Sequence, residues 1–192
     1  MQYKPMIIGM TGASGSIYAI RLLEKLRALQ IETHLVMSDS SKMTLRAETD
    51  SKIEDVTALA TYVHHYKNIG AIISSGSFIT AGMIIAPCSM HTLSEIAAGI
   101  SSNLLSRAAD VVLKERRRLV LLTRETPLHA GHIRAMAYAT ENGAIVMPPV
   151  PAFYARPKTL DDMIDHTVMR CLDLFGIHMK EQARWEGIEA CF

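Results

Sequence analysis

The sequence is poor in aromatic residues, in paired cysteines and in net charge, and each shortage excludes a class of protein. Aromatic residues make up 6% of the 192 positions and the formal net charge is +1, so neither base stacking nor phosphate attraction favours a nucleic-acid partner. The three cysteines (Cys88, Cys171 and Cys191) are odd in number and widely spaced, which predicts neither a disulfide framework nor a zinc site. A reducing cytoplasm is the simplest setting for such a chain.

Long apolar runs are also absent, although apolar residues make up 49% of the chain. No run approaches the roughly 18–20 residues of a membrane span, and the N-terminal run is too short for a signal peptide. Short apolar runs instead alternate with segments of helical period, which predicts one α/β domain over residues 1–192 with a mostly parallel sheet. Strands are expected at residues 7–10, 31–37, 82–86, 119–123 and 144–147. Helices are expected at residues 16–29, 38–49, 53–60, 103–115 and 129–142, with others ending near 98 and beginning near 160.

The stretch Thr11-Gly12-Ala13-Ser14-Gly15 joins the first strand to the first helix. Backbone N–H groups of such a turn and of the following helix start are unpaired and bind anions such as phosphate. The glycines at 9, 12 and 15 do not have the dinucleotide spacing, and the second strand ends in Ser38 where a dinucleotide site needs an acid. The loop therefore favours a mononucleotide, FMN, with a plain turn that binds no ligand as the alternative.

Polar residues also follow the other predicted strands. The third strand runs into Pro87–Thr92, the fourth into Arg124 and Glu125, and the last into the stiff segment Pro148–Tyr154. Carboxyl ends of parallel strands form the ligand-binding edge of an open sheet, so we expect a flavin over the small residues and a second anion beside Arg124 and Lys114. Thr126 is expected to cap the next helix.

Three features leave two interpretations open. Cys88 is a nucleophile or, with more weight, a small buried residue, because no acid or base is fixed near it. His64 and His65 are adjacent and cannot share one helix face, so a polar surface is favoured over a metal pair. The segment Ser74–Phe78 is a mobile flap or only a loop.

Several stretches together resemble the UbiX family of flavin prenyltransferases, which is related to flavin-containing cysteine decarboxylases. The resemblance spans nearly the whole chain and rests on Thr11-Gly12-Ala13-Ser14-Gly15, Ile73-Ser74-Ser75-Gly76-Ser77-Phe78, Pro87-Cys88-Ser89, Arg107–Arg116, Arg124–His129, Met147–Tyr154 and Arg184-Trp185. The resemblance implies a three-layer, flavodoxin-like Rossmann core. It implies transfer of the dimethylallyl group of dimethylallyl phosphate to N5 and C6 of reduced FMN, without a metal. The product serves a UbiD-type aromatic acid decarboxylase, and family members form dodecamers with sites built across subunits.

The resemblance also implies roles for individual residues. Those that would hold FMN are Gly12, Ala13, Ser14, Ser38, Ser89, Met90, His91, Thr92 and Arg124. Those that would bind dimethylallyl phosphate are Lys114, Arg124, Tyr154 and Arg170. Catalytic roles fall to Glu125, Ser14 and Tyr154, with Glu125 and Tyr154 moving protons. The alternatives are a flavin oxidoreductase, a decarboxylase acting alone, and a non-catalytic FMN-binding subunit of a hydroxyarylic acid decarboxylase complex.

Overall fold

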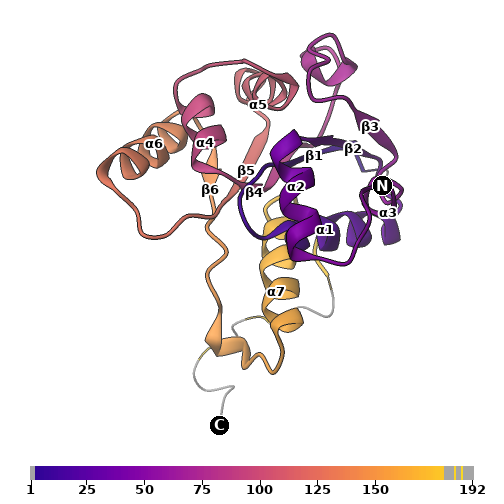
Figure 1. The fold of residues 1–192 in the computed structure, drawn as a ribbon, viewed down its shortest axis with the longest axis vertical. Coiled ribbons are helices and arrows are strands. Elements are labelled where there is room, and N and C mark those ends of the chain that lie inside the picture. Colours follow the sequence, from indigo (N-terminus) through magenta and orange to yellow (C-terminus); the bar gives the residue numbers. More distant parts are fainter. Residues whose placement is uncertain (1–2, 180–183, 185–186, 188–192) are drawn as a thin grey trace. The chain divides into compact units, whose positions relative to one another are not determined.

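The computed structural model describes residues 3–179, 184 and 187, and it divides the chain into two compact units (Figure 1). The first unit is Met1–Pro148 and the second is Pro149–Phe192. The boundary falls inside the proline-rich segment, which cannot join the centre of a sheet because its prolines lack N–H donors. The expectation of one domain over residues 1–192 stays a prediction.

The first unit is built on a six-stranded parallel sheet in the order β3-β2-β1-β4-β5-β6. The strands are β1 (Met6–Met10), β2 (Thr33–Met37), β3 (Tyr62–His64), β4 (Gly82–Cys88), β5 (Arg118–Thr123) and β6 (Ile145–Val146). All residues of β1, β2 and β4 are buried, as expected of a parallel sheet covered on both faces. The predicted α/β fold with a mostly parallel sheet is confirmed. Without β3, the other five strands follow the flavodoxin order, and β3 extends it to the classic Rossmann order.

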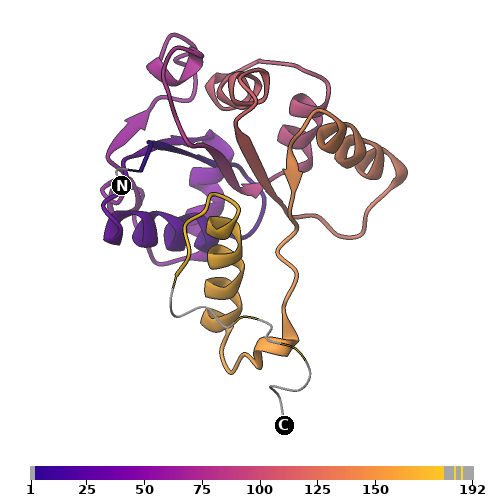
Figure 2. The same ribbon diagram turned by 180° about the vertical axis from the view of Figure 1, so that it is seen from behind.

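Helices cover both faces of this sheet (Figures 1 and 2). The helices of the first unit are α1 (Ser16–Ala28), α2 (Asp39–Glu48), α3 (Ile53–Thr57), α4 (Met90–Ala97), α5 (Leu104–Lys114) and α6 (Ala130–Glu141), with a 3₁₀ turn η1 (Ile72–Ser74). The buried face of α5 packs with side chains of alternate sheet positions, such as Met83 and Leu121, in one core. Helix α1 lies on the opposite face, where Leu22, Leu23 and Leu26 are fully buried. These layers leave the carboxyl ends of the strands open at one edge.

The structure departs from the expected elements in two places. The edge strand β3 was not predicted, because it has only three residues and Tyr62 and Val63 are about half exposed, so no apolar alternation marks it. Thr126 does not cap a helix: residues 124–129 are non-helical and α6 begins at Ala130. The cap is His129, whose Nδ1 accepts a hydrogen bond from Gly131 N at 3.0 Å.

The second unit holds a 3₁₀ turn, η2 (Phe153–Ala155), and the long helix α7 (Leu160–Asp173). Thr159 and Asp162 form a capping box at the start of α7. The helical period of the sequence predicts one apolar face with Leu160, Ile164, Val168, Cys171 and Phe175. Ile164, Val168 and Cys171 are buried as predicted and Phe175 is partly buried, whereas Leu160 is 73% exposed. Among the described residues, no helix has the length and apolar character needed to cross a membrane.

Candidate functional site

The candidate site is the edge of the sheet where β1, β2, β4 and β5 end. Each of the first three strands leads within a few residues into a helix, so the N-termini of α1, α2 and α4 gather there. Backbone bonds join the segments that leave the strands: Ser38 N donates to Met10 O at 3.0 Å, and Arg124 N donates to Cys88 O at 3.1 Å. The edge therefore combines helix N-termini with a cation, which suits an anionic ligand.

Thr11 ties the glycine loop to the start of α4. Its Oγ1 donates to Pro87 O at 2.7 Å and accepts from Ser89 N at 2.8 Å, and the residue is only 2% exposed. Sequence reasoning gave Thr11 no role, because both partners lie more than seventy positions away. The two predicted FMN-binding segments, residues 12–14 and 89–92, are thus fixed to each other by one side chain.

Gly12 is required by a close approach to α2. A Cβ at this position would lie 2.6 Å from both Cβ and Oγ of Ser40, and the hydroxyl of Thr44 donates to Gly12 O at 3.1 Å. Gly15 has a φ of 113°, in the left-handed region that favours glycine. The glycine loop is therefore pinned against α2 by close packing at residue 12 and turned into α1 at residue 15.

Two of the predicted FMN-binding serines serve as helix caps. The hydroxyl of Ser38 accepts from Ser41 N at 3.0 Å at the start of α2, and that of Ser89 accepts from Thr92 N at 3.3 Å at the start of α4. Ser38 and Thr92 are each 6% exposed, whereas His91 is exposed. The caps hold both serines at the edge of the sheet, so the structure brings these predicted residues together.

The start of α1 already carries an anionic group, the carboxylate of Glu48. Its oxygens accept from Gly15 N at 3.0 Å and from Ser16 N at 3.0 Å. Burial acts to raise the pKa of Glu48, but hydrogen bonds from Ser14, Ser16 and Gly15 outweigh it, and the pKa is lowered. The expectation that these backbone N–H groups are unpaired is wrong. The sequence carries no signal for this contact, which joins residues 33 positions apart.

Arg124 and Glu125 follow β5, as predicted. Arg124 Nε and the hydroxyl of Thr123 are buried, and neither has a hydrogen-bond partner among the described residues. Glu125 is exposed, and its Oε1 accepts from Thr126 N at 3.1 Å. A buried guanidinium nitrogen without a partner beside helix N-termini fits the site of a ligand with acceptor atoms, such as a flavin mononucleotide.

Cys88 and the adjacent histidines do not add chemistry to this edge. Cys88 is fully buried, and burial raises the pKa of its thiol far above the ordinary value, so the interpretation as a packed residue is confirmed. His64 Nε2 lies 2.8 Å from His34 Nδ1, while His65 is exposed. Within the described part of the chain, no group of three or more His, Cys, Asp or Glu side chains is placed to hold a metal ion.

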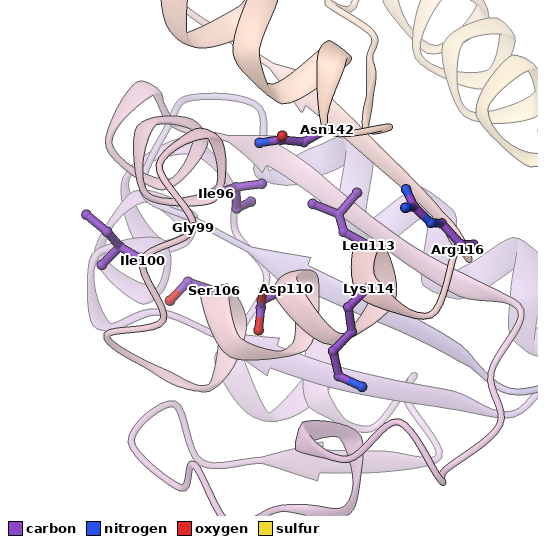
Figure 3. Close-up of a pocket in the computed structure, with 9 residues that line it drawn as sticks. All are labelled: Ile96, Gly99, Ile100, Ser106, Asp110, Leu113, Lys114, Arg116 and Asn142. Carbon is purple, nitrogen blue, oxygen red and sulfur yellow. The ribbon is translucent and has the colours of Figure 1, made fainter.

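Lys114 lies at the opposite edge of the sheet from Arg124. It ends α5, whereas Arg124 follows β5, and the six residues of β5 span about 20 Å between the two ends. Lys114 and Arg124 therefore lie far apart within a single chain, because α5 runs back to the amino ends of the strands, and that both bind one anion stays a prediction. Lys114 pairs with Glu115 and lines a pocket of about 290 Å³ with Asp110 and Asn142 (Figure 3).

Tyr154 and Arg170 belong to the second unit, where each has a polar partner. Tyr154 Oη lies 3.1 Å from His166 Nε2, and Arg170 Nη1 donates to Asp173 Oδ2 at 2.7 Å. Asp173 is nearly buried, with its side chain 6% exposed. That Tyr154 and Arg170 join the residues of the sheet edge stays a prediction. Trp185, which contributed to the resemblance, is outside the described residues.

Comparisons with known proteins point to a flavin-binding protein. The family model described as Flavoprotein matches residues 1–171. A curated protein from Thauera aromatica, Flavin prenyltransferase UbiX, is 58% identical over 96% of this chain and 95% of its own length. The crystal structure of AnUbiX (PadA1) in complex with FMN and dimethylallyl pyrophosphate is 48% identical, with a TM-score of 0.95 over 97% of this chain and 99% of that one. A dodecameric FMN-dependent UbiX-like decarboxylase from Escherichia coli O157:H7 is also 48% identical, with a TM-score of 0.93 over 95% of this chain and 100% of that one.

Proposed function

The chain belongs to the UbiX family of flavin prenyltransferases, and we propose that it transfers the dimethylallyl group of dimethylallyl phosphate to reduced FMN. The observation that carries this proposal is the carboxyl edge of the sheet. There, Ser38 and Ser89 begin α2 and α4 at the same ends of the strands as Arg124, whose buried Nε has no protein partner among the described residues. The residues present fit a flavin mononucleotide, whose phosphate and ring supply acceptor atoms for such donors.

We assign FMN to the residues of this edge. Gly12, Ala13, Ser14 and Ser38 bind the phosphate end, and residues 89–92 with Arg124 bind the remainder. Support comes from the Thr11 bonds that fix residues 12–14 to residues 89–92. When bound in its reduced form, FMN supplies the N5 and C6 atoms to which the dimethylallyl group is joined.

Lys114, Arg124, Tyr154 and Arg170 are assigned to the donor. As its carbon–oxygen bond breaks, negative charge grows on the phosphate, and cations held in advance stabilise that charge. Glu125 is exposed at the end of β5, where it can take up a proton, and Tyr154 can give one to the departing phosphate. Ser14 is the third candidate, because its hydroxyl is hydrogen-bonded to the Glu48 carboxylate.

Lys114 reaches this site from a second copy of the chain. Within one first unit, the length of β5 separates Lys114 from Arg124, so a single chain does not place both beside one donor phosphate. The UbiX-like structure from E. coli O157:H7 is a dodecamer. We therefore propose that this chain forms a homo-oligomer, a dodecamer, with each site completed by a neighbour.

The proposal also covers which prenyl donor the protein uses and which protein receives its product. We favour the monophosphate donor, although the AnUbiX complex contains dimethylallyl pyrophosphate. The product, prenylated FMN, passes to a UbiD-type decarboxylase in the cytoplasm. Cys88 and Cys171, both free and buried, are compatible with that reducing compartment.

The test is the mass of the flavin after anaerobic incubation of the purified protein with reduced FMN and either dimethylallyl phosphate or the diphosphate. We expect a flavin heavier by one prenyl unit with the monophosphate. An unchanged mass with both donors would overturn the proposal and favour a non-catalytic FMN-binding subunit. Glu125→Gln should bind FMN and leave its mass unchanged, and Glu141→Gln, at an exposed position of α6, is the matched control.

A further inference from the structure

The segment Ile73–Phe78, which the proposed function does not use, is held against the end of α5. Arg117 donates two hydrogen bonds to it, from Nη1 to Phe78 O at 2.7 Å and from Nη2 to Gly76 O at 2.6 Å. Within the segment, Phe78 N donates to Ser75 O at 3.3 Å, which closes a turn at residues 75–78. We call residues 75–78 the clamped turn. It is fixed by a forked guanidinium and is not a free flap.

The clamped turn packs directly on the Lys114–Glu115 ion pair. A Cβ at Gly76 would lie 2.1 Å from Glu115 Oε1 and 2.8 Å from Lys114 Nζ. The φ of Gly76 is not positive, so its backbone conformation does not require glycine, and an added Cβ would displace the flexible ends of the Glu115 and Lys114 side chains. The carboxylate of Glu115 thus occupies the room that a side chain at residue 76 would take, and there it meets the ammonium of Lys114.

We propose that Glu115, seated against the clamped turn, is the positioning residue for Lys114. The inference rests on the proposed function, in which Lys114 binds the donor phosphate at a neighbour's site. A lysine ammonium is a point charge on a flexible stem, and Lys114 is about half exposed, so α5 alone does not fix it. Glu115 takes one of its three N–H donors and leaves the other two for phosphate oxygens.

The clamped turn distinguishes the Lys114–Glu115 pair from an ordinary surface ion pair and increases its energetic contribution. Exposed pairs contribute little because both side chains must be ordered at an entropic cost. Here the carboxylate lies against Gly76, and Arg117 holds Gly76 through a hydrogen bond to its carbonyl oxygen. Residues 73–78 and 107–116 are two separate motifs in the sequence, and in the structure they act together to hold the Lys114 side chain in place.

Two substitutions displace the carboxylate while preserving every charge. Gly76→Ala places a methyl group where the Glu115 carboxylate lies, and Glu115→Asp shortens the side chain that carries the carboxylate by one methylene. Each is compared with a matched control: Gly70→Ala, where the nearest atom to a new Cβ is 3.6 Å away, and Glu24→Asp in the Arg21–Glu24 pair of α1, where Glu24 is exposed. The readout is the Kd of dimethylallyl phosphate for the protein loaded with oxidised FMN, measured by calorimetry, which requires no turnover.

We expect Gly76→Ala and Glu115→Asp each to raise this Kd roughly two- to fivefold, the upper part of the range for exposed ion pairs, and to leave FMN affinity and assembly size unchanged. In a Lys114→Ala background, both effects should vanish, because a residue that acts through Lys114 has nothing left to position.

Three results would overturn the inference: an unchanged or lowered Kd in both variants, an equal rise in the Lys114→Ala background, or a Lys114→Ala protein that binds the donor normally. A lowered Kd would mean that Glu115 competes with the phosphate. Failure of the proposed function looks different, because the unaltered protein would then bind the donor without changing the mass of FMN.

Discussion

Replacing Thr11 by valine tests whether one buried hydroxyl joins the two FMN-binding segments. The hydroxyl donates to Pro87 O at 2.7 Å and accepts from Ser89 N at 2.8 Å. Valine has nearly the same shape but offers neither a donor nor an acceptor. Pro87 O keeps the bond from Thr11 N at 3.3 Å, whereas Ser89 N loses this acceptor.

The expected cost follows from these two bonds. A buried group left without its partner costs about 1–3 kcal/mol, so we expect Thr11→Val to lower the free energy of unfolding by about 2 kcal/mol. For a chain of this length, that corresponds to a fall of about 4–8 °C in Tm. FMN affinity should fall as well, because residues 12–14 and 89–92 are no longer fixed to each other.

Thermal and urea unfolding at one fixed protein concentration, with FMN titration, measure these effects. Thr11→Ser is the control, since it keeps both hydrogen bonds and loses one buried methyl, at a cost of about 0.8 kcal/mol. A Thr11→Val protein as stable as Thr11→Ser, with unchanged FMN affinity, would refute the reasoning.

Three further predictions concern the same edge and its neighbour. The pKa of Glu48 is lowered in the folded protein, so its carboxylate stabilises the fold above the ordinary pKa of 4.5, and this stabilisation is lost as the pH falls through the folded pKa. Glu48→Gln should therefore lower Tm at neutral pH and have no such effect in acid. Equal Tm values for the two proteins at neutral pH would contradict the assignment. Gly12→Ala should weaken FMN binding about tenfold, the lower part of the roughly 1–3 kcal/mol that overpacking costs, because its Cβ would clash with Ser40. Ser40→Gly should restore binding in the double variant, and a double variant that binds no better than Gly12→Ala would show that this clash is not the cause. Lys114→Ala and Arg124→Ala proteins, each inactive alone, should regain prenylation when their subunits are mixed, whereas persistent inactivity would exclude sites shared between chains.

The parallel sheet and the small polar residues at the carboxyl ends of its strands could be predicted from local sequence. Buried apolar runs such as Gly82–Ala86 and the small polar residues after them, such as Ser38 and Ser89, signal strands that end at helix starts. The signals are local because a capping hydroxyl and the N–H group that donates to it lie within three residues.

The remaining features depend on contacts that no local pattern records. Glu48 reaches the start of α1 from the end of α2, and Thr11 reaches α4 from β1, so both act across long sequence separations. Thr126-Pro127 has the pattern of a helix start, yet His129 supplies the cap and the chain between them is not helical. The place of Lys114 follows from the direction of α5 across the sheet, which fixes it at the amino ends of the strands.

A crystal structure of the FMN-bound assembly is the most direct measurement. We expect the FMN phosphate to lie at the backbone of residues 12–14 and at Ser38, with Arg124 Nε within hydrogen-bond distance of the flavin and a neighbour's Lys114 facing the donor position. FMN bound at any other surface, with Arg124 Nε still without a partner, would contradict a flavin site at the carboxyl edge of this sheet.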